Sequence, residues 1–87
     1  MKTQEIFDLR SRDFWLDAIE QWVHNEVDRK LLVRRFLDGR VYEPLSEEFM
    51  MSANHCKKRV DKALEQLFKH IDIDEILKDI DKVLIIE

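Results

Sequence analysis

The 87-residue sequence contains a single glycine and a single proline, so few positions force a helix to break. Leu, Ile, Glu, Lys and Arg are abundant instead, and most of these residues favour helix. A chain of this length is sufficient for one small domain. The sequence therefore predicts an all-α fold, a small bundle of four to five helices.

The sequence is equally poor in features of secreted and membrane proteins. Its one cysteine cannot form an internal disulfide and is typical of a reducing compartment. No apolar run approaches the roughly 20 residues that a membrane helix requires, and the first residues lack the apolar block of a signal peptide. We expect a cytoplasmic protein that does not associate with membranes.

Few residues are arranged for catalysis or metal binding. The three histidines (His24, His55 and His70) are scattered, and no Cys or His pair has the spacing of a zinc site. No glycine-rich phosphate loop is present. Cys56 falls on an apolar helix stripe, which predicts a core residue. We therefore expect neither an enzyme nor a bound metal or cofactor.

The formal net charge of −4 argues against a nucleic-acid partner, but the charge is unevenly distributed. Residues 72–87 hold six acids against Lys78 and Lys82, so this segment alone carries −4. Residues 1–71 are therefore balanced, and the stretch 57–62 within them contains four cations and one acid. The net charge of the whole chain therefore does not reveal the locally basic stretch, because the acidic residues 72–87 outweigh it.

Apolar periodicity predicts two helices in the first half of the chain. The first runs from about Asp13 to His24, with Ser11 or Asp13 as its N-cap and with Trp15 and Trp22 as core or interface anchors.

The second helix spans "NEVDRKLLVRRFLDG" and is predicted to begin at the N-cap Asn25 and to end at a left-handed Gly39. Leu32 and Phe36, four residues apart, give it an inner face. Its outer face is basic through Arg29, Lys30, Arg34 and Arg35.

A third, short helix is predicted to have Pro44 at its first position and an inner face of Leu45 and Phe49. Met50 and Met51 then form a turn and are expected to fill gaps around it. Met50 occupies a position that often holds glycine, and a left-handed conformation there costs roughly 1 kcal/mol.

Ser52 is predicted to cap a fourth helix that reaches about His70. One apolar stripe defines its inner side: Cys56, Val60, Ala63, Leu64 and Leu67.

A fifth, acidic and amphipathic helix is predicted in residues 72–87, beyond a domain that spans residues 1–71. Its apolar side (Ile73, Ile76, Leu77, Ile80, Val83 and Leu84) requires a cover. It either packs back on Trp15 and Trp22 or pairs with a second copy. The homodimer is favoured, because "VLIIE" places apolar residues on more than one side.

The side of the fourth helix opposite its apolar stripe is polar and cationic in the first turns. By chemistry, Asn54 suits adenine and Lys58 suits guanine in the major groove, whereas Lys57, Arg59 and Lys62 suit phosphates. A solvated helix face would show a similar run of charge. Spacing alone leaves both interpretations open.

The run "DRKLLVRRFLDGRVYEPLSEEFMMSANHCKKRVDKALEQL", residues 28–67, resembles region 4 of bacterial sigma factors and related small regulators of phages and mobile elements. The match extends over about 40 residues without a gap. Its features are Arg35-Phe36-Leu37-Asp38-Gly39, Tyr42-Glu43, Leu45, Ser46, Ser52, Cys56, Lys57, Arg59, Ala63-Leu64 and Leu67.

The resemblance implies a helix-turn-helix that binds double-stranded DNA and regulates transcription, in a family whose members also bind RNA polymerase. By position it implies DNA contact from Asn54, His55, Lys57, Lys58 and Arg59, with backbone support from Arg34, Arg35 and Arg40. Segments for the −10 element and for core docking are missing, which favours a small regulator over a complete sigma factor. The alternative is a protein-interaction module that binds RNA polymerase or another regulator without independent DNA binding.

Overall fold

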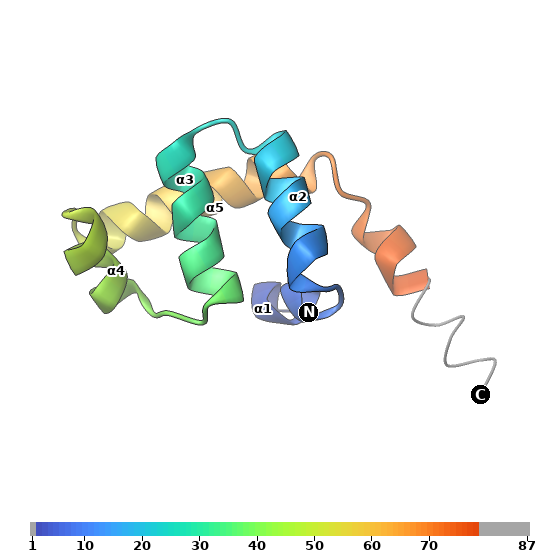
Figure 1. Ribbon diagram of the computed structural model, residues 1–87, viewed down its shortest axis with the longest axis horizontal. Coiled ribbons are helices and arrows are strands. Elements are labelled where there is room, and N and C mark those ends of the chain that lie inside the picture. The colour runs from blue at the N-terminus through green and yellow to red at the C-terminus, as the bar shows by residue number, and fades with distance from the viewer. Residues whose placement is uncertain (1, 79–87) are drawn as a thin grey trace.

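The computed structural model describes residues 2–78 of the chain, and most of these residues are helical (Figure 1). No β-strand occurs among them, so the predicted all-α fold is confirmed. The elements are α1 (Thr3–Asp8), α2 (Arg12–Trp22), α3 (Glu26–Leu32), the π-helical turn η1 (Val33–Leu37), α4 (Tyr42–Phe49), α5 (Ala53–Phe68) and a last helical segment at residues 73–78.

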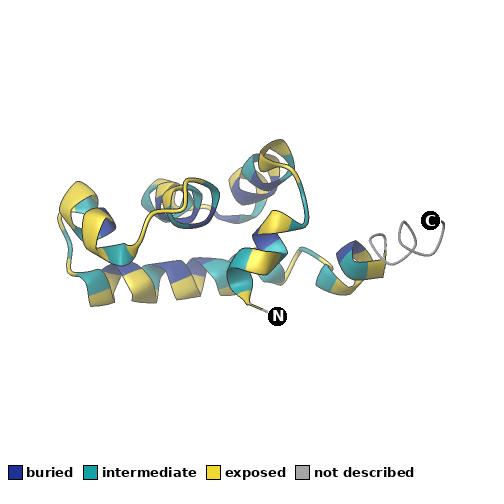
Figure 2. Cartoon of the chain, turned by 90° about the horizontal axis from the view of Figure 1, so that it is seen from below, coloured by how far each residue is buried: buried dark blue, intermediate teal, exposed yellow. Residues whose placement is uncertain are grey.

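Helix α5 is the element against which the bundle packs. Helices α2, α3 and α4 all contact it, and Figure 2 shows them along one side of α5. The predicted stripe forms that side: Cys56, Val60, Ala63 and Leu67 are buried, and Leu64 lies half-buried at its edge. The orientation of α5 is therefore fixed by its own apolar residues.

Three predicted N-caps are confirmed: Ser11 for α2, Asn25 for α3 and Ser52 for α5. Each side-chain oxygen accepts from a backbone N–H two or three residues further on, at 2.9–3.2 Å. These bonds satisfy donors that have no partner within the helix.

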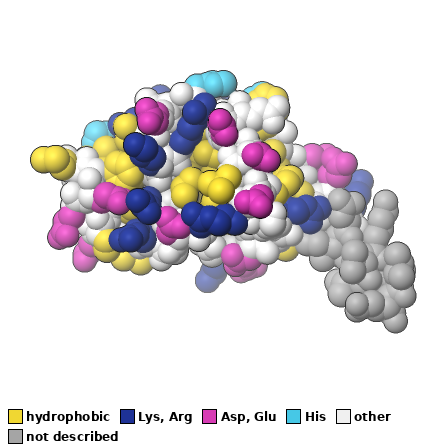
Figure 3. All heavy atoms as spheres, in the orientation of Figure 1, with side chains coloured by type: hydrophobic (Ala, Val, Ile, Leu, Met, Phe, Trp, Pro, Cys, Tyr) yellow, Lys and Arg dark blue, Asp and Glu magenta, His cyan; other side chains and the backbone are white. Residues whose placement is uncertain are grey.

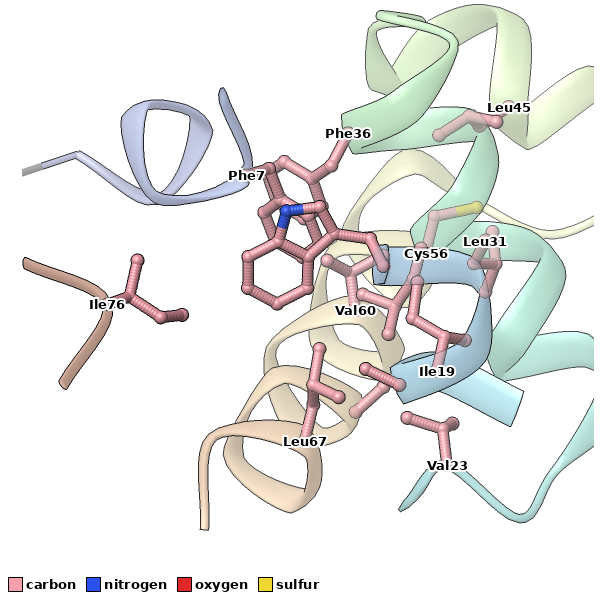
Figure 4. Close-up of a cluster of buried hydrophobic side chains, with 14 residues drawn as sticks. Phe7, Ile19, Val23, Leu31, Phe36, Leu45, Cys56, Val60, Leu67 and Ile76 are labelled. Atoms are coloured by element: carbon pink, nitrogen blue, oxygen red, sulfur yellow. The ribbon is translucent and has the colours of Figure 1, made fainter. Parts of the chain in front are cut away.

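Helix α1 was not predicted, yet it completes the core. Its Phe7 side chain is 2% exposed, and its ring lies 4.5 Å from that of Trp15 and 4.7 Å from that of Phe36 (Figure 4). The ring of Phe68, at the end of α5, lies 6.1 Å away. The N-terminal turn thus joins α2, η1 and α5 through one aromatic cluster.

Three predicted helix boundaries were wrong, and one of them is the end of α5, which lies at Phe68 rather than at about His70. Helix α2 ends at Trp22 rather than at His24, because Val23 is extended. Helix α4 begins at Tyr42, so Pro44 is its third residue rather than its first. Proline fits there because backbone N–H groups in the first turn have no partner within the helix.

Two residues adopt left-handed backbone conformations, Gly39 with φ of 73° and Met50 with φ of 55°. Gly39 ends the α3–η1 helix as predicted. The prediction that Met50 fills a gap was wrong, because its side chain is 91% exposed. Met51, by contrast, packs against the core.

These two positions predict opposite responses to substitution. Met50→Gly should raise the free energy of unfolding by about 1 kcal/mol, because glycine adopts this conformation without a steric cost. Gly39→Ala should lower it by a similar amount; an added Cβ meets no atom within 4 Å, so the cost arises from the backbone alone. Urea unfolding of both variants measures these changes, and a destabilised Met50→Gly variant would contradict the argument.

The chain beyond α5 contacts α2 and then continues past the end of α5 (Figures 1 and 2). The His70 ring stacks on Trp22 with ring centroids 4.0 Å apart, and Ile76 is 5% exposed within the same core. The described part of the predicted fifth helix therefore packs on the rest of the bundle. Its remaining apolar positions (Ile80, Val83 and Leu84) lie outside the described residues. Within residues 2–78, no helix has the length and apolar character that crossing a membrane requires.

Candidate nucleic-acid interface

The side of α5 that points away from the other helices is exposed (Figure 2), and the residues in its N-terminal half are polar. We call this surface the α5 face and define it by five exposed residues: Asn54, His55, Lys57, Lys58 and Lys62. Its nearest acid on the helix is Asp61, which is also exposed. Six of the nine residues predicted to contact DNA lie on α5, and five of them form the α5 face.

The turn before α5 presents the start of this face. Helix α4 lies over the N-terminal end of α5 in both ribbon views, and its Leu45 is fully buried (Figures 1 and 2). Only Met50, Met51 and Ser52 separate the two helices. The left-handed Met50 reverses the chain, and Ser52 begins α5 by accepting from the backbone N–H of His55 at 3.0 Å.

Arg59 lies at the side of α5 that faces α3. Its Nε donates to Asp28 at 2.8 Å, and a terminal nitrogen donates to the side-chain oxygen of Asn25 at 3.2 Å. Asn25 is also the N-cap of α3. Arg59 therefore joins the start of α3 to α5, and a DNA phosphate would compete with Asp28 for its charge.

Arg35 and Arg40 belong to the segment between α3 and α4. The Arg35 guanidinium lies 5.1 Å from the ring centroids of both Phe36 and Tyr42, a cation–π arrangement. Arg40 is exposed in the loop before α4. The structure thus places Arg35 among aromatic rings rather than on the α5 face.

Arg34, the remaining predicted contact, lines a groove of about 690 Å³ between α3 and α4. We call this surface the α3 groove. Half-buried apolar residues form its floor (Val27, Val33 and Phe49), and cations form its rim (Arg12, Arg29, Lys30 and Arg34). The basic outer face of the second helix was recognised in the sequence, but its partners from α2 and α4 were not.

A chain of ion pairs crosses one end of the groove. Asp38 pairs with Arg12 at 2.9 Å and with Arg34 at 3.1 Å, and Arg34 also pairs with Glu48 at 3.3 Å. Burial alone would raise the pKa of Asp38, but the hydrogen bonds and charges of the two arginines outweigh it and lower the pKa. The Asp38 carboxylate therefore joins α2 to η1, and Arg34 extends the chain of ion pairs to α4.

The other cations of the rim are less neutralised. Lys30 pairs with Glu26 of the same helix at 3.6 Å, and both side chains are largely exposed, so the pair is weak. Arg29 donates to the backbone carbonyls of Glu20 and Val23 at the end of α2. These carbonyls satisfy its donors but carry no full negative charge.

Cys56 belongs neither to the α5 face nor to the α3 groove. It is fully buried, and burial raises the pKa of its thiol despite the nearby charge of Arg59. It is the core residue that the apolar stripe predicts. Among residues 2–78, no group of three or more His, Cys, Asp and Glu side chains is placed to hold a metal ion.

No protein-family model, curated protein or solved structure matches this chain, so the interpretation of the α5 face rests on its own residues and geometry.

Proposed function

We propose that the protein binds duplex DNA and regulates transcription, with α4 and α5 as a helix-turn-helix and the start of α5 in the major groove. One observation carries the proposal: Asn54 and Lys58 are exposed in the first turns of a helix whose opposite side is locked in the core. A recognition helix reads bases with such residues, directly after the turn.

The α5 face divides into two kinds of contact. Asn54 offers the paired donor and acceptor that match adenine, and Lys58 offers a donor for guanine. Lys57 and Lys62 suit the phosphates on either side of the groove. Arg59, which already pairs with Asp28, acts as a positioning residue that holds α5 against α3.

The resemblance to sigma factor region 4 supports the same proposal. The turn position that often holds glycine carries a left-handed Met50, and Ser52 caps the helix that follows. A small regulator from a phage or another mobile element is the source that this resemblance favours. RNA polymerase is then a second partner of the DNA-bound protein.

Selection of bound duplexes from a random pool tests the proposal. We expect enrichment of one motif, whose affinity falls as salt rises because bound phosphates release counterions. If Lys57 and Lys62 each neutralise one phosphate, the logarithm of the binding constant should fall with the logarithm of salt at a slope of about −2. A pool without an enriched motif, even at low salt, would contradict sequence-specific binding.

The α3 groove favours a second candidate, a module that binds RNA polymerase or another regulator without independent DNA binding. Its apolar floor and cationic rim are features of a protein-binding surface. Capture of RNA polymerase that is insensitive to salt and requires no DNA, together with failure of the selection, would favour this candidate.

A further inference from the structure

The α3 groove has a chemistry that one segment of this same chain complements. We propose that the groove binds residues 79–87 of a second copy, so that two chains exchange their C-terminal segments in a homodimer. The inference rests on the groove and on the sequence of that segment, and it does not depend on DNA binding.

The groove side provides an apolar strip framed by cations. A second depression of about 420 Å³ adjoins the groove and shares Arg29, Lys30 and Val33 with it; it adds the apolar residues Leu16 and Ile19 of α2 and the acids Glu20 and Glu26. The two depressions together follow the outer side of α3. Figure 3 shows hydrophobic side chains at the centre of this face, with both basic and acidic side chains around them.

The segment side provides the matching residues. Residues 79–87 read "DIDKVLIIE", with four consecutive apolar residues between Lys82 and Glu87. Three acids against one lysine give the segment a net charge of −2. The α3 groove itself carries four cations against the two acids Asp38 and Glu48, a net charge of +2, whereas the adjoining depression adds only the charges of Glu20 and Glu26; the positive charge that faces the segment is therefore that of the groove. Opposite charge steers such surfaces together, and apolar contact then holds them.

The direction of the chain favours a second copy over the segment's own groove. Ile76 is buried in the core of its own bundle, which fixes where the segment begins. Figures 1 and 2 both show residues 73–78 beyond α2, leading away from α3 and α4. In a twofold dimer each chain gives one segment and receives one, so the assembly is closed.

Sedimentation mass tests whether the segment holds two copies together. The wild-type chain should sediment at twice the 10.6 kDa of one chain, and Leu84→Asp should sediment at the mass of one chain, because a charge enters the apolar contact. Circular dichroism of Leu84→Asp verifies that the bundle itself is folded. A single-chain mass for the wild type, or an unchanged double mass for Leu84→Asp, would overturn the proposal.

A pair of charge reversals tests which surface receives the segment. Lys30→Glu alone and Asp81→Lys alone should each weaken dimerisation by about tenfold, because each dimer contains the altered contact twice. When the two variants are mixed, one contact is wild-type and the other is a swapped ion pair, so dimerisation should recover. A segment that bound its own groove would show no recovery on mixing, and that result would overturn the exchange.

Lys58→Glu is the matched control, since it reverses an exposed lysine on the α5 face. It should leave the mass unchanged and weaken duplex binding. Leu84→Asp should lose the dimer and bind the duplex normally, whereas Lys58→Glu should keep the dimer and bind the duplex more weakly. These two results tell the two proposals apart. A dimer lost equally in Lys58→Glu would refute the assignment of the interface to the groove.

Discussion

Replacing Lys58 with alanine is expected to weaken binding of the selected duplex by about 5- to 150-fold, the range that corresponds to 1–3 kcal/mol for a specific base contact. Asn54→Ala is expected to have an effect of similar size. Both side chains are exposed on α5, so neither change removes a core contact. Fluorescence anisotropy with the selected duplex and with a scrambled duplex measures the loss and its dependence on sequence.

Lys2→Ala is the matched control for this experiment. Lys2 is exposed and immediately precedes α1, which Figure 1 shows apart from the turn between α4 and α5. The control should bind the duplex as the wild type does, and all three variants should unfold at the wild-type urea concentration. Equal affinity of the wild type, Lys58→Ala and Asn54→Ala at low salt would rule out direct readout by these residues.

Phe7→Ala is expected to lower the free energy of unfolding by about 3–5 kcal/mol, the usual cost of removing a buried phenyl ring. The ring is 2% exposed and contacts three other aromatic side chains, so its removal leaves a cavity among residues from three helices. Small domains have a total stability of about 5–15 kcal/mol. The midpoint of thermal unfolding should therefore fall by more than about 10 °C.

Glu5→Ala is the control on the same helix. Its side chain is exposed, and the change should alter stability by less than about 0.5 kcal/mol. If Phe7→Ala unfolds at nearly the same temperature as Glu5→Ala, α1 does not belong to the cooperative core that the aromatic cluster indicates.

The parts of the fold that could be predicted from the sequence are those with local causes. Ser11, Asn25 and Ser52 each cap the helix that follows, and a cap needs only a side-chain oxygen and the next few N–H groups. The helical spacing of the apolar stripe from Cys56 to Leu67 was sufficient to predict which side of α5 is buried. The polar α5 face follows from that stripe, since the exposed side is its complement.

The parts that could not be predicted depend on contacts distant in sequence. Helix α1 has six residues and no side-chain cap, so neither its period nor its ends are recognisable before its Phe7 meets Trp15 and Phe36. The π-helical turn η1, in which the N–H of Asp38 donates to the carbonyl of Val33 at 2.9 Å, also escapes a pattern based on 3.6 residues per turn.

The same limit applies to the candidate site. In the sequence Arg59 is one member of a basic cluster, but in the structure its Nε donates to the carboxylate of Asp28, thirty-one residues earlier, at 2.8 Å. The α3 groove combines residues of α2, α3, η1 and α4, so no single stretch of sequence displays it. Long-range ion pairs decide which cations remain free for a partner, and residue spacing does not encode them.

The two methionines at the turn have opposite surroundings although they are adjacent, since Met50 is 91% exposed and Met51 packs against the core. Their methyl groups are therefore a built-in pair of NMR reporters. Beside the signal of Met1, selective carbon-13 labelling of methionine gives one signal that senses solvent or a ligand at the turn and one that senses the packing of the bundle. Titration with duplex DNA should shift the first signal more than the second.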